Sequence, residues 1–191
     1  MSILINKHDV INLRYFYRFL LSIVASQSLV FFIHQHKGLA SFIQYALADW
    51  VTDIYRYFFT GITVNGNVII VNSERYLIID NECTALMLSA SVASAIFALN
   101  YSLLSRIFSI VISLLLIQFE NILRILHLIF EIQKPDNLFN FYHLYIWQGI
   151  NFLTAVVVIL IAEHMMKRFS INHQGNKDRT WYASYSLSKK C

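Results

Sequence analysis

The stretch that decides the fold is residues 106–125, which read RIFSIVISLLLIQFENILRI. The hydrocarbon core of a bilayer is about 30 Å thick, and a helix needs about 20 apolar residues to cross it. Between its two arginines this stretch carries one charged residue, Glu120, so it predicts a membrane-spanning helix. Three further apolar stretches, at about 15–33, 83–100 and 141–166, predict three more spans.

The composition of the whole chain agrees with a membrane protein. Hydrophobic residues make up 57% of it and charged residues 14%, whereas a soluble domain usually has about 25% charged residues. Five glycines and one proline favour long helices and exclude a disordered protein. We expect an all-α membrane bundle forming one polytopic domain over residues 1–166, followed by a cytoplasmic polar tail over 167–191 without a folded element.

Residues 39–59 differ from the predicted spans because acidic residues interrupt them. Each aspartate would cost about 2.5–3.5 kcal/mol at the bilayer centre, so we expect an amphipathic helix in the membrane interface. A fifth span over the same residues is the alternative. The expected apolar face lies opposite the charged residues Asp49, Asp53 and Arg56, and consists of Phe42, Ala46, Trp50, Ile54 and Phe58.

Residues 62–80 have the composition of β-strands. The runs VIIV at 68–71 and YLII at 76–79 are rich in β-branched residues. Asn65-Gly66 is a favoured hairpin turn, because both residues tolerate positive φ. A small β-meander is marginal alone in water, so we expect it to form a cap packed on the helices.

The distribution of lysine and arginine predicts the orientation in the membrane. With the N-terminus inside, the pieces 1–18, 101–106 and 167–191 hold ten of the fifteen basic residues. The segment 34–82 holds three basic residues against five acidic ones. We therefore expect a multi-pass protein of the cell (inner) membrane, with the cap on the extracytoplasmic side.

Three reactive side chains lie at the ends of predicted spans. Cys83 opens the second span, Arg124 closes the third and His143 opens the fourth, so antiparallel threading brings all three to one membrane face. A thiolate can attack a carbonyl, an imidazole can move the proton, and a guanidinium can stabilise the oxyanion. The combination predicts acyl transfer, with the active site on the extracytoplasmic face.

Neighbouring residues support this site. Cys83 follows Asp80-Asn81-Glu82, which reads as a helix cap, and a thiol at a helix N-terminus has a lowered pKa. Charged and amide groups in a span are costly in lipid, so Glu120 and Asn121, close to Arg124, indicate a polar pocket. His127 lies one turn beyond Arg124 and is a rival to His143 as the base. The alternative is that these residues only pack, with Cys83 inert and Arg124 paired with Glu120.

Other classes of site are not supported by the sequence. The two cysteines lie 108 positions apart and provide no zinc-ligand spacing, so we expect no metal and no other cofactor. The basic residues cluster only at the chain ends, so no nucleic-acid partner is expected. The expected partners are membrane lipids and the substrate of the acyl transfer.

The order of these features resembles the exosortase/archaeosortase family of membrane transpeptidases, over roughly residues 39–166. The resemblance is carried by GITVNG at 61–66, Cys83 opening a span, NILR at 121–124, and His143. It implies a cysteine protease/transpeptidase acting on exported proteins that carry a C-terminal sorting tail, made of a short motif, a transmembrane helix and a basic cluster. The enzyme would cleave this tail and transfer the new C-terminus.

The resemblance also implies a role for each matched residue. Cys83 would be the nucleophile, Arg124 the oxyanion partner and His143 the acid/base, and Asn121 matches the family's asparagine three residues before the arginine. The family's cysteine is commonly followed by Ser-Gly, whereas Thr84-Ala85 stands here. A non-catalytic membrane assembly or scaffold subunit is the other function open to this sequence. A transporter is disfavoured, because the polar residues gather at one face instead of lining a path.

Overall fold

Helices dominate the computed structural model, which describes residues 7–72, 74–134 and 138–188. The helices are α1 (Lys7–Gln35), α2 (Lys37–Phe58), α3 (Leu86–Ala98), α4 (Leu103–Gln133), α5 (Phe139–Phe141) and α6 (Trp147–Ser188). A 3-10 turn, η1 (Asn81–Thr84), precedes α3, and a π turn, η2 (Tyr142–Ile146), joins α5 to α6. The strands are β1 (Thr63–Asn65), β2 (Val68–Ile70) and β3 (Tyr76–Ile78).

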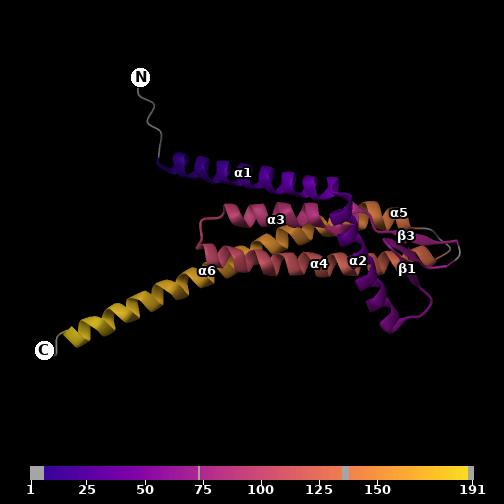
Figure 1. Cartoon of the computed structure of the whole chain (residues 1–191). Coiled ribbons are helices and arrows are strands. Elements are labelled where there is room, and N and C mark those ends of the chain that lie inside the picture. The colour runs from indigo at the N-terminus through magenta and orange to yellow at the C-terminus, as the bar shows by residue number, and fades with distance from the viewer. Residues whose placement is uncertain (1–6, 73, 135–137, 189–191) are drawn as a thin grey trace, which may run out of the picture.

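The long helices lie roughly side by side, and α2 crosses them at one end, next to the strands (Figure 1). Helix α1 packs on α3, α3 packs on α4 and α6, and α4 packs on α6. The start of α1 and the end of α6 lie away from the sheet (Figure 1). The start of α3, the end of α4 and the start of α6 therefore share the end that carries the sheet.

Within the described residues, three helices are long and apolar enough to cross a membrane. They cover Phe16–Gln35, Leu103–Gln133 and Phe139–Phe169, the last running through α5, η2 and the start of α6. The span expected at 83–100 is shorter, because α3 has 13 residues and a length of about 20 Å at 1.5 Å per residue. It is shortened because Asn81–Thr84 form a 3-10 turn and Ala85 takes a left-handed conformation.

The C-terminal tail differs from the prediction, and α2 packs on the protein through a face that was not predicted. The tail expected to lack folded structure continues α6 to Ser188, and residues 189–191 lie outside the described residues. Residues 167–188 contain no proline and one glycine, so little in them interrupts a helix. In α2 the buried face comprises Ala40, Leu47, Ala48, Val51, Thr52 and Tyr55, whereas the expected apolar residues Phe42, Trp50, Ile54 and Phe58 are exposed.

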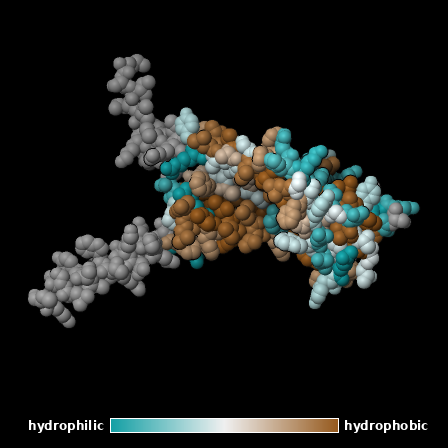
Figure 2. Space-filling model, viewed as in Figure 1, coloured by the Kyte–Doolittle hydropathy of each residue, from teal (hydrophilic) through white to brown (hydrophobic). Residues whose placement is uncertain are grey.

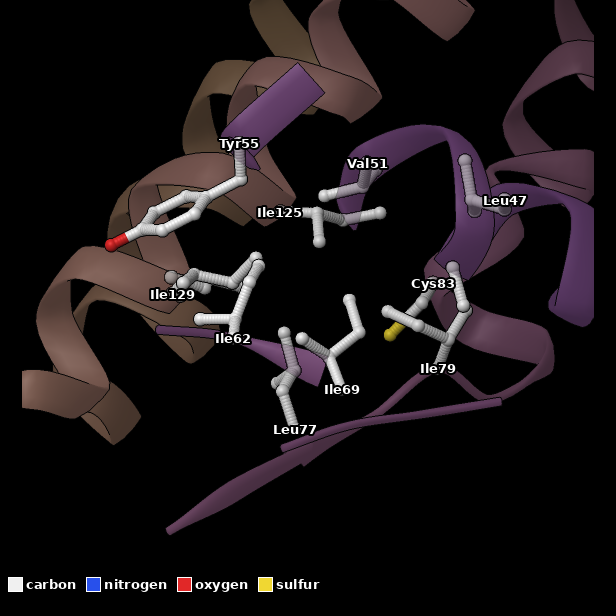
Figure 3. Close-up of a cluster of buried hydrophobic side chains, with 12 residues drawn as sticks. Leu47, Val51, Tyr55, Ile62, Ile69, Leu77, Ile79, Cys83, Ile125 and Ile129 are labelled. Carbon is white, nitrogen blue, oxygen red and sulfur yellow. The ribbon is translucent and has the colours of Figure 1, made fainter. Parts of the chain in front are cut away.

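The predicted β-meander is confirmed. The strands are antiparallel in the order β1-β2-β3, with Val64 opposite Ile69 and Ile69 opposite Leu77. The turn between β1 and β2 is Gly66-Asn67, one residue later than the predicted Asn65-Gly66, because Asn65 is in β1 and pairs with Val68. Gly66 has a φ of +62°, which suits the first central position of a two-residue hairpin turn. The buried side chains of the sheet pack against α2 and the end of α4 in one apolar cluster, formed by Leu47, Val51, Tyr55, Ile62, Ile69, Leu77, Ile79, Cys83, Ile125 and Ile129 among others (Figure 3).

Arg75 ties the sheet to the end of α4. Its Nη1 donates to the carbonyl oxygens of Ile132, at 2.7 Å, and Lys134, at 2.9 Å. The last carbonyls of a helix have no partner within the helix, and arginine is one of the residues that satisfies them. The cap is therefore attached to the helix that carries Arg124 by both apolar packing and hydrogen bonds.

Candidate functional site

Cys83 lies in the turn η1, directly after the sheet. The Asp80 carboxylate accepts hydrogen bonds from the backbone N–H groups of Glu82, at 3.0 Å, and Cys83, at 3.1 Å. Asp80 thus provides the cap that the sequence predicts. The capped element is a 3-10 turn instead of the first turn of a long helix.

The thiol of Cys83 faces the apolar cluster. Only 8% of the residue is exposed, and its sulfur lies between Ile69 and Ile79 (Figure 3). Burial raises the pKa of Cys83 to about 11, the negative charge of Asp80 also raises it, and the positive charge of Arg124 lowers it. The expected low pKa is therefore wrong for this conformation, because burial of the thiol outweighs the lowering effects of the backbone hydrogen bond with Asp80 and the charge of Arg124.

This raised pKa predicts a slow, pH-dependent reaction of Cys83 with alkylating reagents. Thiolate is the reactive form, so the iodoacetamide rate should rise about tenfold for each pH unit below the pKa. The rate would be followed by mass spectrometry at pH 7, 8 and 9 in the Cys191→Ala protein, which keeps one thiol. The same protein unfolded in detergent is the control and should react faster at each pH. Equal rates in the folded and unfolded protein would contradict the buried, protonated thiol.

Arg124 and His143 are in direct contact. Arg124 Nη2 lies 3.0 Å from His143 Nε2, and Arg124 is 7% exposed. A guanidinium can only donate, so Nε2 accepts, and the neutral imidazole carries its proton on Nδ1. The His143 ring stacks on Phe139 with ring centroids 5.6 Å apart. The two side chains that the sequence places at one end of the bundle therefore meet there.

Helix α4 also holds the backbone of the cysteine turn. Asn121 Nδ2 donates to the carbonyl oxygen of Cys83 at 2.7 Å, and Gln118 Nε2 donates to that of Thr84 at 3.2 Å. Asn121 was expected to support the site, and it does so through the backbone of the nucleophile candidate. Gln118 was missed, although an amide three residues before Asn121 in an apolar span was the available signal.

The other two supporting residues occupy contacts of their own. Asn151 on α6, which was also missed, orients its amide nitrogen toward Glu120, 2.9 and 3.2 Å from the two carboxylate oxygens. His127 contacts Trp147 and Glu131. Of the two candidate bases, His143 is therefore the one that contacts Arg124, and Arg124 takes His143 as its partner instead of Glu120.

The residue two positions after Cys83 has an unusual backbone conformation. Ala85 has a φ of 54° and a ψ of 17°, a left-handed conformation that glycine adopts readily and that costs other residues about 1–2 kcal/mol. In the family that the chain resembles, glycine is common at this position. Ala85 thus has a left-handed backbone at the position where the family's motif has glycine.

Substitution of Ala85 should show this constraint. We expect Ala85→Gly to keep or slightly raise the Tm in detergent, and Ala85→Val to lower it by several degrees because a β-branched residue is strained at positive φ. Ala93→Val, within α3, is the matched control and should change the Tm little. If Ala85→Val had the same Tm as Ala93→Val, the left-handed conformation at residue 85 would be contradicted.

The described residues include no group of three or more His, Cys, Asp or Glu side chains that could hold a metal ion. The site consists of a buried thiol, an arginine–histidine pair, and amides that hold the backbone around the thiol. No family model matches the chain, and neither a curated protein nor a solved structure is similar to it. The resemblance to the exosortase/archaeosortase family therefore stays a prediction from the sequence.

Proposed function

We propose that this chain is a membrane-embedded cysteine protease/transpeptidase of the exosortase/archaeosortase type. It would cleave the C-terminal sorting tail of exported proteins and transfer the new C-terminus to an acceptor. The observation that carries the proposal is the contact of Arg124 with His143 at 3.0 Å. Arg124 is on α4, and Asn121 on the same helix donates a hydrogen bond to the carbonyl oxygen of Cys83.

The proposed reaction has two stages. His143 Nε2 accepts the thiol proton of Cys83, the sulfur attacks the scissile carbonyl carbon, and Arg124 donates to the oxyanion. The C–N bond then breaks, and His143 returns the proton to the leaving amine, which leaves a thioester on Cys83. An acceptor nucleophile attacks this thioester, loses its proton to His143, and releases Cys83, which regains a proton as a thiol.

The resting arrangement requires a change before this reaction begins. Arg124 occupies the His143 lone pair that would receive the proton, and Cys83 is a buried thiol with a raised pKa. A bound substrate carbonyl would attract Arg124 and free Nε2. The site described here is accordingly the latent form of the enzyme.

The proposed membrane position rests on the exposed apolar surface. Hydrophobic residues cover much of the helical bundle, whereas hydrophilic residues are more frequent at the end that holds the sheet (Figure 2). On α2, Phe42, Trp50, Tyr57 and Phe58 are each 65–84% exposed, and aromatic residues are typical of the membrane interface. We propose that α2 lies in the extracytoplasmic interface, that α3 is the fourth crossing, and that Cys83 lies at the membrane surface.

Reporter fusions test this orientation. An alkaline phosphatase inserted at the Gly66-Asn67 turn should be active, because this enzyme folds only outside the cytoplasm, and one fused after Phe169 should be inactive. The expectation follows from the ten basic residues on the assigned inner side and the positive-inside rule. Green fluorescent protein at the same positions is the matched control and should give the opposite pattern. An inactive phosphatase at the turn would contradict the orientation.

A non-catalytic scaffold is the second candidate function. The observation that favours it is that Cys83 is 8% exposed, inside the apolar cluster. In this case the Arg124–His143 contact would only join α4 to the turn η2. The scaffold hypothesis predicts that Cys83→Ala leaves function unchanged, which the enzyme hypothesis excludes.

The C-termini of exported proteins test the enzyme hypothesis. They would be compared by mass spectrometry in the source cells with and without this chain. We expect a set of proteins to lose its tail only when the chain is present, and the same proteins to keep the tail when it is absent. Identical C-termini in both strains would reject the transpeptidase and leave the scaffold.

A further inference from the structure

The π turn η2 places His143. A π turn has hydrogen bonds from residue i to i+5, is rare, and is frequent at functional sites. Here the backbone N–H of Trp147 donates to the carbonyl of Tyr142 and closes the turn. His143 is its second residue, so the direction of its ring depends on this turn.

His127 contacts both ends of the π turn. The His127 ring centroid lies 5.0 Å from that of Tyr142 and 5.6 Å from that of Trp147, both edge to face. In a regular α-helix, residues five apart point about 140° away from each other, so they could not both face one ring. His127 therefore makes a pair of contacts that the wider turn permits and an α-helical turn does not.

A hydrogen bond and a polar contact orient the ring of His127. Trp147 Nε1 lies 3.2 Å from His127 Nδ1, and because an indole only donates, Nδ1 accepts and the neutral ring is protonated at Nε2. This Nε2 lies 3.5 Å from Oε1 of Glu131, a residue 3% exposed that also binds Lys134 Nζ at 2.6 Å. Both nitrogens of His127 are engaged, which leaves neither free to act as a base.

We propose that His127 is a positioning residue, which holds residues 142–146 in the π conformation and thereby directs His143 Nε2 to Arg124. If the turn relaxed to an α-helix by one residue, His143 would rotate about 100° around the axis of α6. Arg124 and His127 lie one turn apart on α4, so the helix that presents the guanidinium also holds the turn that presents the imidazole. The geometric part of this proposal stands alone, and its catalytic consequence rests on the proposed function.

Two substitutions at position 127 separate the possible roles. His127→Phe keeps a ring against Tyr142 and Trp147 but removes the hydrogen bond from Trp147 and the polar contact with Glu131. His127→Gln keeps one acceptor for Trp147 and one donor for Glu131. His164→Gln, on an exposed part of α6, is the control. The full chain, labelled with 15N at histidine, would be examined in lipid nanodiscs at pH 8 by NMR of the ring nitrogens.

In the wild type we expect His143 to be unprotonated at Nε2 and protonated at Nδ1. His127→Gln and His164→Gln should keep this tautomer, whereas His127→Phe should give a mixture of tautomers because the Arg124 contact is lost. An unchanged His143 signal in His127→Phe would overturn the positioning role, whether or not this variant still removes the tails of exported proteins. If the His143 signal changes in His127→Phe but the wild-type protein removes no tails, the positioning role is supported and the proposed function is rejected.

Tail removal gives the second readout. We expect His127→Gln to process near the wild-type rate, and His127→Phe to be slower by up to about 100-fold, since a misplacement of about 1 Å can cost this much. If His127→Gln were as inactive as His127→Phe while its His143 signal stayed unchanged, His127 would be the proton-transfer residue and the positioning role would be wrong.

Discussion

Replacing Arg124 with lysine should slow tail removal almost as much as replacing it with alanine, by about 100-fold to 1000-fold, as for the loss of an oxyanion donor. Arginine presents a planar fork of donors, whereas lysine presents a compact ammonium on a flexible stem. The Arg124 guanidinium donates to His143 at 3.0 Å in a buried position. A lysine there would not present its donors to both His143 and an oxyanion in the same way.

The measurement is the rate at which the tail is lost in membranes with equal amounts of each variant. Arg106→Lys is the matched control, because Arg106 is at the other end of α4, where its Nη1 donates to Phe97 O at 2.9 Å. This control should keep the wild-type rate. Full activity in Arg124→Lys would mean that the site needs only a positive charge, and the oxyanion role would be wrong.

The depth of the candidate residues could be predicted from the sequence. Helix length and antiparallel threading determine which residues share an end of a bundle, so Arg124 and His143 could be placed together without any side-chain information. The contact at 3.0 Å agrees with that prediction. The meander at 62–80 was also predictable, because Asn65-Gly66 and the β-branched runs are local signals.

The direction in which each side chain points could not be predicted in the same way. Cys83 turns into a cluster built from α2, the sheet and α4, and no local pattern shows that these distant segments enclose the thiol. Helix α2 has two apolar faces, and the pattern alone does not indicate which packs on protein. His127 and His143 could not be ranked either, because helical spacing assumes 3.6 residues per turn and the π turn departs from it.

The shortness of α3 has a local cause that hydropathy does not report. Residues 83–100 are apolar enough to suggest a span, but the first two belong to the capped turn and Ala85 breaks the helix with its left-handed backbone. The same break holds Cys83 at the end of the bundle, outside α3. The irregularity that shortens the span is thus part of the candidate site.

Replacing Cys83 with alanine tests the central claim most directly, because every step of the proposed reaction passes through its sulfur. Alanine is small enough for the apolar cluster around Cys83, so the protein should still fold. Cys191→Ala, whose position lies outside the described residues, is the matched control and should process normally. Hydroxylamine, which cleaves thioesters, should release exported protein with a C-terminal hydroxamate from membranes that contain Cys83.

The measurement is mass spectrometry of the C-termini of exported proteins in wild-type, Cys83→Ala and Cys191→Ala strains, with the variant proteins present in equal amounts. We expect cleaved C-termini, and hydroxamates after hydroxylamine treatment, in the wild-type and Cys191→Ala strains. The Cys83→Ala strain should contain neither and should accumulate proteins with intact tails. Cleaved C-termini at the wild-type level in the Cys83→Ala strain would contradict the cysteine transpeptidase.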